Sequence, residues 1–301
     1  MTETTPNNLP LKKTHPKSRP WPGTASLEVS LLWAGHTGER ETCILDGDRV
    51  AGITPLLDPQ SSIRGNPHRL KANAEKSFIG SYVLGTGFIL EPEEAQDLIV
   101  KDPRNKTVLF PYLNGEDLNS RWDLSASRWV IDFNDWPIER AMDYQEVFAI
   151  IDEKVRPERQ RTKPDGSYVL RKPLPQRWWQ YADKRPALRK AVANLDRVLV
   201  VSRVTKYFSF ALVPRAQVYN ERLAIFASLS YTLLCMLSCG LHENWALANG
   251  TTQETRPTYF PEKCFETFPQ PHFTARMEHA GTTVRVCYLP GWRWPVSAAR
   301  S

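Results

Sequence analysis

Cysteine is scarce in this chain of 301 residues, and the five present, at positions 43, 235, 239, 264 and 287, are widely dispersed. An odd, scattered set is not a disulfide framework and is typical of a reducing cytoplasm. Cys235 and Cys239 have neither a CxxC spacing nor a neighbouring histidine pair, and His242-Glu243 lacks the second histidine of a metalloprotease helix. The sequence therefore predicts a cytoplasmic protein without a metal site.

Long hydrophobic runs are also missing. The longest uncharged stretch, Leu223–Leu241, has 19 residues and is interrupted by Ser228, Thr232 and Gly240, among others. This pattern predicts a buried strand that runs into a helix, and no membrane contact. The first 23 residues hold five prolines and no apolar run, so they predict neither a signal peptide nor a folded element.

Catalytic motifs are the third absence. Gly85-Thr86-Gly87 lacks the third glycine of a nucleotide cradle and predicts a tight turn instead. Asn66-Pro67 is followed by His68, so it cannot supply the Pro-Pro-aromatic loop with which amino-methylating enzymes hold a flipped base. Asp152-x-Lys154 resembles half of a magnesium nuclease site, but its position on a helical stripe favours a solvated face. The sequence therefore predicts a binding protein, not a catalyst.

Positive charge is present and concentrated. Residues 154–206 hold 15 Lys/Arg against four Asp/Glu, a net charge of +11, so the rest of this +6 chain carries −5. The same block contains Tyr168, Trp178, Trp179 and Tyr181. A dense cationic stretch interleaved with aromatics is typical of a protein that binds a polyanion, most often nucleic acid. The alternative from composition alone is a solvated basic surface above core aromatics.

Hydrophobic periodicity predicts an α+β fold with mixed, mostly antiparallel sheets and packed helices. Val198–Val201 is a continuous apolar run, which predicts a strand buried on both faces. The other strands are expected at Leu27–Trp33, Phe78–Leu84, Phe88–Leu90, Leu109–Leu113, Arg128–Phe133 and Tyr207–Val213. Helices are expected at Pro92–Lys101, Tyr144–Val155, Pro175–Lys184, Pro186–Leu195 and Ser230–Asn249.

Several segments occur in an order that resembles a known family. They are Phe110-Pro111-Tyr112-Leu113-Asn114-Gly115-Glu116-Asp117-Leu118-Asn119, Ser127-Arg128-Trp129-Val130-Ile131-Asp132-Phe133, Trp178-Trp179-Gln180-Tyr181, Val198-Leu199-Val200-Val201-Ser202-Arg203-Val204-Thr205-Lys206, Glu254-Thr255-Arg256 and Cys264-Phe265-Glu266-Thr267-Phe268-Pro269. Together they resemble the target-recognition region of adenine-specific DNA methyltransferases, namely type IIG/IIL restriction–modification enzymes and related phage-defence methylases. The resemblance spans Ser26 to Pro271.

This resemblance implies a domain organisation. Residues 1–25 are a disordered proline-rich lead, residues 26–271 are the target-recognition region, with subdomains of about 26–140 and 141–271, and residues 272–301 form an atypical tail. In the family, a preceding methyltransferase domain supplies the S-adenosylmethionine pocket, so this chain is expected to hold no cofactor. We expect a gene fragment whose tail comes from a shifted reading frame; the alternative is a stand-alone specificity protein.

The resemblance and the charge pattern together suggest which residues contact DNA. Arg203 and Lys206 follow a rigid buried strand, which suits base readout, whereas the flexible Pro/Gly-containing stretch around Lys163 suits phosphate contacts. Arg128 fits either a groove reader or a salt-bridge partner. The candidates for base readout are Arg203, Lys206, Arg128 and Arg256. The candidates for backbone contacts are Arg159, Arg161, Lys163, Arg171, Lys172 and Arg177. Trp178 and Trp179 are expected in the core.

The predicted function is sequence-specific binding of double-stranded DNA, as the target-recognition part of an adenine-specific (N6) DNA methyltransferase or restriction–modification protein. The partners are duplex DNA and, if the methylase is a separate protein, a methyltransferase subunit. The alternative is a remnant or intact enzyme acting on its own, either an S-adenosylmethionine-dependent methylase or a nuclease. An RNA-binding or protein-interaction domain is a minor third option.

Overall fold

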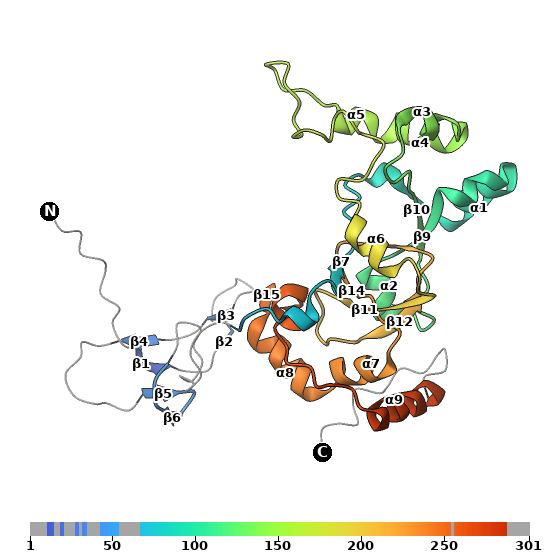
Figure 1. The fold of residues 1–301 in the computed structure, drawn as a ribbon. Helices are drawn as coiled ribbons and strands as arrows, with labels where there is room; N and C mark the ends of the chain where they lie inside the picture. Colours follow the sequence, from blue (N-terminus) through green and yellow to red (C-terminus); the bar gives the residue numbers. More distant parts are fainter. Residues whose placement is uncertain are drawn as a thin grey trace. The chain divides into compact units, whose positions relative to one another are not determined.

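The computed structural model describes residues 11–14, 19–20, 28–29, 32–34, 43–53, 67–253 and 256–287 (Figure 1). The chain divides into two compact units, Met1–Asn66 and Pro67–Ser301. The strand expected at Leu27–Trp33 falls on two shorter ones, β3 (Glu28–Val29) and β4 (Leu32–Ala34). Leu27, Ser30 and Leu31 lie outside the described residues.

The first unit contains a sheet of strand order β4-β1-β5-β6 and a two-stranded pairing of β2 with β3. The remaining strands are β1 (Leu11–Thr14), β2 (Arg19–Pro20), β5 (Cys43–Leu45) and β6 (Asp48–Val50). Asp46 and Gly47 join β5 to β6 with φ values of 53° and 99°. The sequence Asp46-Gly47-Asp48 predicts a turn, and two left-handed residues are what a two-residue hairpin loop requires, so this prediction is confirmed.

The second unit begins with a sheet of strand order β13-β9-β10-β8. Its strands are β8 (Ile89–Leu90), β9 (Leu109–Leu113), β10 (Arg128–Ile131) and β13 (Val218–Tyr219). The helices of this part are α1 (Pro92–Lys101), α3 (Ile138–Met142), α4 (Gln145–Lys154) and α5 (Arg156–Arg159), with the 3₁₀ turns η2 (Thr86–Phe88) and η3 (Pro103–Thr107). Phe88, Val130 and Ile151 are fully buried where these elements meet.

A second sheet, of order β12-β11-β14-β7, is covered on both faces. Leu199 and Val201 of β11 (Arg197–Ser202) face the core shared with α7 (Tyr231–Leu237), α8 (Gly240–Asn249) and the π-helical turn η4 (Pro261–Phe265). Val198 and Val200 face the core shared with α2 (Gly115–Ser120) and α6 (Pro186–Val192). The other strands are β7 (Ser77–Ile79), β12 (Ala211–Pro214) and β14 (Leu223–Phe226). The prediction of a strand buried on both faces is confirmed.

The fold class is α+β, with mixed and mostly antiparallel sheets and packed helices, as predicted. Among the described strands the parallel pairs are β1 with β5 and β13 with β9. A small hairpin of β15 (Thr251–Gln253) and β16 (Arg256–Thr258) completes the sheets of the second unit, and η1 (Lys71–Asn73) precedes β7. No helix among the described residues has the length and apolar character needed to cross a bilayer.

Four predicted elements were wrong. The strand predicted at Phe78–Leu84 ends at Ile79 of β7, and Leu84 has φ +52°, which is not extended backbone. The segment Pro175–Lys184 is not a helix but a series of turns, closed by hydrogen bonds such as Gln180 N to Arg177 O at 3.0 Å. Tertiary packing overrides local helix preference here, because the side chains of Trp178, Trp179 and Tyr181 are all drawn into one core.

The helix predicted at Ser230–Asn249 is two helices, α7 and α8, and Cys239 between them is extended, with φ −81° and ψ 154°. The break turns α8 so that His242 and Ala246 are buried along with Leu233 and Leu237 of α7. The strand predicted at Tyr207–Val213 begins only at Ala211, because Arg197–Val200 pair with Ala211–Pro214 and leave Tyr207 beyond the ladder.

The segment after Pro271 forms α9 (Ala275–Cys287), and residues 288–301 lie outside the described part of the chain. Thr232 of α7 donates from Oγ1 to Glu278 Oε2 at 3.0 Å and lies against Gly281, where a Cβ would approach its backbone nitrogen to 2.8 Å. This part of the tail is therefore packed against α7.

Candidate nucleic-acid interface

The turn after β11 and the strand β16 lie together. Arg203 O accepts from Tyr259 N at 2.7 Å, Thr205 N donates to Pro257 O at 3.4 Å, and Val204 is bridged to Thr258. This pairing brings Arg203 and Lys206 close to Arg256, although they are about 50 residues apart in the sequence. Three of the four base-readout candidates therefore belong to one surface region.

Arg203 is held at the base of this region. Its Nη1 donates to Glu221 O at 2.9 Å, its Nε lies 3.4 Å from Tyr259 O, and its guanidinium stacks 5.1 Å from the centre of the Phe260 ring. The side chain is half-buried, and this burial lowers the pKa of the guanidinium. The structure thus gives Arg203 a role in tying two loops together, and its role as a base reader stays a prediction.

Lys206 and Arg256 are both exposed. Lys206 Nζ lies 5.2 Å from the centre of the exposed Tyr207 ring. Arg256 pairs with Gln253 across the β15–β16 hairpin, while Glu254 and Thr255 of the same motif lie outside the described residues. Both cations project from short, hydrogen-bonded backbone, which is the setting that base readout requires.

Arg222 is a residue that sequence reasoning missed. It is exposed, and its carbonyl accepts from Arg203 N at 2.8 Å, so it borders the same surface. The signal that could have found it is the polar run Asn220-Glu221-Arg222 between two apolar strands, which marks a loop at a strand end. We call the set Arg203, Lys206, Arg222 and Arg256 the reading cluster.

Arg128 belongs to a different sheet. It is exposed at the start of β10, opposite Tyr112 of β9. No ion pair involves it among the described residues, so the salt-bridge alternative has no partner in the part of the chain that the structure describes.

The prediction for Arg159 needs correction. Its side chain is fully buried, with Nη2 donating to Val83 O at 2.9 Å and to Leu84 O at 2.7 Å, and with the guanidinium 5.8 Å from the centre of the Phe88 ring. A buried cation is costly unless it is hydrogen-bonded, and these carbonyls compensate Nε and Nη2, whereas Nη1 has no hydrogen-bond partner among the described residues. Arg159 therefore fastens α5 to the segment before η2 and does not contact phosphate in this conformation.

The other cations of the basic block fall into two groups. Several are used internally: Arg185 pairs with Asp183 at 2.9 Å, and the carboxylates of Asp132 and Asp135 pair with Arg189 and Lys184. The backbone-contact candidates that remain exposed are Arg161, Lys163, Arg171, Lys172 and Arg177. Among the described residues none of these five side chains forms an ion pair.

The stretch around Lys163, expected to be flexible, is a hydrogen-bonded hairpin. Lys163 N donates to Ser167 O at 2.8 Å, Val169 N donates to Arg161 O at 2.9 Å, and Gly166 N donates to Lys163 O at 3.0 Å. Pro164-Asp165 at the tip followed by Gly166 with φ +79° is typical of a type I turn closed by a left-handed glycine. We call residues 161–169 the basic hairpin.

The block's aromatic residues serve the core, as predicted for Trp178 and Trp179. Both are buried, and Trp179 Nε1 donates to Trp136 O at 2.9 Å. Tyr181 is buried with them and donates from its hydroxyl to Ile131 O at 2.7 Å. Tyr168, in the basic hairpin, is instead exposed.

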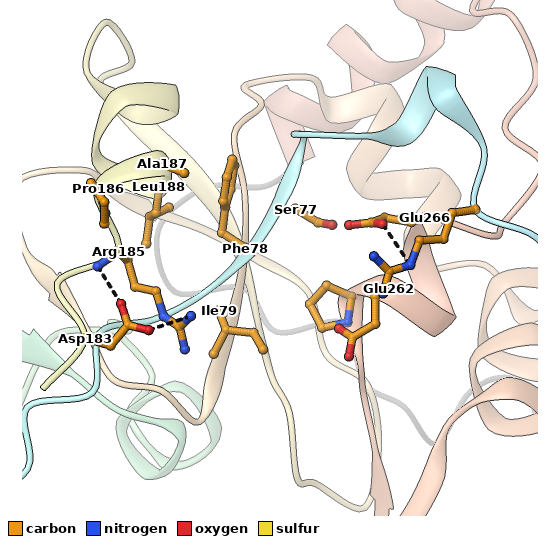
Figure 2. A pocket seen from close by; sticks show the side chains of 12 residues that line it. Ser77, Phe78, Ile79, Asp183, Arg185, Pro186, Ala187, Leu188, Glu262 and Glu266 are labelled. Carbon is orange, nitrogen blue, oxygen red and sulfur yellow. Dashed lines mark hydrogen bonds and ion pairs between the residues drawn. The ribbon is translucent and has the colours of Figure 1, made fainter. Parts of the chain in front are cut away.

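A pocket of about 370 Å³ lies between β7, the start of α6 and η4 (Figure 2). Ion pairs of Arg185 with Asp183 and of Arg69 with Glu266 (3.5 Å) flank it, and Glu262 also lines it. Three carboxylates thus face two guanidinium groups, which makes the pocket a poor site for a polyanion. No residue of the reading cluster lines it.

Residues 60–272 match the family described as "MmeI, target recognition domain". This match covers more than half of the chain, so the chain belongs to that family.

Among solved structures, the chain is similar to the type IIL restriction–modification enzyme MmeI in complex with DNA, at 14% sequence identity and a TM-score of 0.70. The likeness covers 93% of this chain and 39% of that chain, so this chain spans about two fifths of the enzyme's length. At this identity the likeness shows the fold. No match was found among curated proteins.

Proposed function

We propose that this chain binds double-stranded DNA in a sequence-specific manner, as the target-recognition part of an adenine-specific (N6) DNA methyltransferase or restriction–modification protein. The family supports a recognition role, because its members are target-recognition domains. The structurally similar MmeI is described in complex with DNA.

The observation that carries the proposal is the reading cluster. Lys206, Arg222 and Arg256 are exposed cations on short backbone segments, and hydrogen bonds through Arg203 and its neighbours fix those segments to one another. Base edges are read by Arg and Lys side chains held in a fixed geometry, with Arg giving two hydrogen bonds to guanine.

The exposed cations outside the cluster supply the nonspecific part of binding. Lys/Arg contacts to phosphates position a protein on the duplex and make affinity fall with salt, by about 0.9 in the log–log slope for each contact. Arg161, Lys163, Arg171, Lys172 and Arg177 are available for such contacts.

The test is a titration of the purified chain with random duplex DNA at two salt concentrations, followed by selection of a preferred site from a randomised pool. We expect binding that weakens steeply with salt and a defined selected sequence. Absence of binding at low salt by a folded sample, or a salt-independent interaction, would refute the proposal. Labelled S-adenosylmethionine is added in parallel, because methyl transfer by the chain alone would favour the enzyme alternative.

A further inference from the structure

The basic hairpin is an unusual surface because it combines exposed cations with exposed apolar groups. Arg161 and Lys163 are exposed, and Tyr168 and Val169 have exposed fractions of 42% and 39%. The hairpin itself holds Arg161, Lys163 and one carboxylate, that of Asp165, whose Oδ1 accepts from Ser167 N at 2.9 Å and from Ser167 Oγ at 2.6 Å. Its net charge is therefore +1, and Arg171 and Lys172, which follow it, raise the net charge of residues 161–172 to +3.

The hairpin is rigid at its tip without contributing to the core. Its backbone hydrogen bonds join Arg161 to Val169 and Lys163 to Ser167, and a bridge joins Thr162 to Tyr168. None of its residues belongs to the three hydrophobic clusters of the second unit. The hairpin is thus ordered and exposes a tyrosine ring, although it does not pack in the hydrophobic clusters. Contact with another molecule would account for this combination.

The hairpin and the reading cluster lie at different ends of the second unit. In Figure 1 the hairpin projects beyond α5, well away from β15 and β11. Duplex DNA is a long, regular polyanion, so one duplex can meet both regions at separate points along its axis. A two-stranded ribbon is also narrow enough to enter the major groove, which is about 12 Å wide.

We propose that the basic hairpin is a second duplex contact, which grips DNA flanking the bases that the reading cluster recognises. Arg161 and Lys163 bind phosphates of the flank, and the ring of Tyr168 packs against its sugars and base edges. Aromatic groups add sequence-tolerant contact to such a cationic grip. The inference rests on the proposed function, because it assumes that the reading cluster binds the same duplex.

The experiment compares duplexes that carry the selected site with a flank extended by one helical turn on one side or on the other. We expect extension on one side to raise the affinity of the full chain about tenfold and to steepen the salt slope by about 2, since two phosphate contacts are added at about 0.9 each. Extension on the opposite side is expected to have no effect.

The variant Arg161→Ala/Lys163→Ala/Tyr168→Ala is expected to bind the duplex without an extended flank and the extended duplexes with equal affinity. Its matched control is Lys106→Ala/Lys190→Ala/Tyr82→Ala, which removes the same charge and a tyrosine of the same 42% exposed fraction from other surfaces. The control should keep the one-sided gain, and thermal unfolding checks that both variants are folded. Tyr168→Ala alone should lower the gain without changing the salt slope.

Each outcome decides the matter. The inference is overturned if extending the flank on one side does not raise the affinity of the wild-type chain. It is also overturned if the hairpin variant keeps that rise in affinity, or if the control variant loses it equally. In each case DNA binding itself still stands. If Tyr168→Ala keeps the whole affinity gain from the extended flank, the Tyr168 ring is not part of the contact. No binding of any duplex would instead refute the proposed function itself.

Discussion

His242 is a buried residue whose protonation state affects the stability of the fold. Its ring is fully buried, Nε2 lies 3.0 Å from the hydroxyl of Tyr259, and the Phe268 ring packs edge-on with a centroid distance of 4.6 Å. Nδ1 has no hydrogen-bond partner among the described residues. Burial in this apolar setting lowers the pKa of His242 to about 4.

This pKa predicts a loss of stability in acid. The unfolded chain takes up a proton near pH 6.5, whereas the folded chain does so only near pH 4. The contribution of neutral His242 to the free energy of unfolding is therefore complete above about pH 6.5 and is lost as the pH falls towards 4. At about 1.36 kcal/mol per pKa unit, the loss is about 3 kcal/mol at most. Urea unfolding at pH 7.5 and 4.5 should show a smaller pH difference in His242→Phe than in the wild type. If the free energy of unfolding changes equally with pH in the two proteins, the loss of stability in acid does not come from His242.

Arg203 and Lys163 are cations of the same basic block with different surroundings. Arg203→Ala removes the ties to Glu221 O and Tyr259 O, so we expect lower stability as well as a loss of about 1–3 kcal/mol on the selected site and relaxed preference at one base pair. Lys163→Ala should leave stability unchanged, weaken binding to all sequences alike and lower the salt slope by about 1.

The measurement is a binding competition among single-base variants of the selected site, together with thermal unfolding of each variant. If Arg203→Ala weakens every variant equally, Arg203 is a structural tie and not a base reader. Lys206, Arg128 and Arg256 are then the next residues to substitute.

At the scale of elements, Gly87 allows η2 to pack closely against the end of α4. A Cβ at this position would lie 2.6 Å from Lys154 Cβ and 2.8 Å from Val155 Cγ2, so η2 packs against the end of α4 only because Gly87 has no side chain. Gly85-Thr86-Gly87 is thus a packing turn, and its first glycine adopts φ +130°.

Gly87→Ala is expected to destabilise the protein by about 1–3 kcal/mol, the usual cost of forcing extra volume into a packed contact. Gly240→Ala is the matched control, because nothing lies within 4 Å of a Cβ there and the residue begins α8. That control should be neutral or more stable by up to about 1 kcal/mol, since alanine favours helix. Equal shifts of the urea midpoint in the two variants would show that the Gly87 contact is not decisive.

At the scale of the whole molecule, the three hydrophobic clusters found among the described residues belong to the second unit. All three hydrophobic clusters are built from residues between Phe78 and Phe273. The exposed cations of the reading cluster and of the basic hairpin belong to the same unit.

A chain that begins at Pro67 is therefore expected to unfold cooperatively with little change in Tm, and to keep the salt dependence of DNA binding. Thermal unfolding and the two-salt titration on this shortened chain are the measurements, with the full chain as the control. Loss of cooperative unfolding would show that residues 1–66 are needed for the fold of the second unit.

The sequence by itself determined the elements whose signals are local. Pro92 after Glu91 and the Glu91–Glu94 capping box set the start of α1, and the apolar run Val198–Val201 set a strand buried on both faces. The family resemblance was also readable, because ordered motifs survive in the linear chain, and residues 60–272 match that family.

Only the tertiary structure decided which charges are free. Arg159 and Lys163 are four residues apart and chemically similar, yet one is enclosed by carbonyls of Val83 and Leu84 and the other is exposed on a hairpin. The partners of Arg159 lie 75 or more residues away in the sequence, so no local pattern could reveal them. Whether a cation contacts solvent, DNA or backbone depends on such long-range neighbours, because burial and hydrogen bonding are set by packing and not by composition.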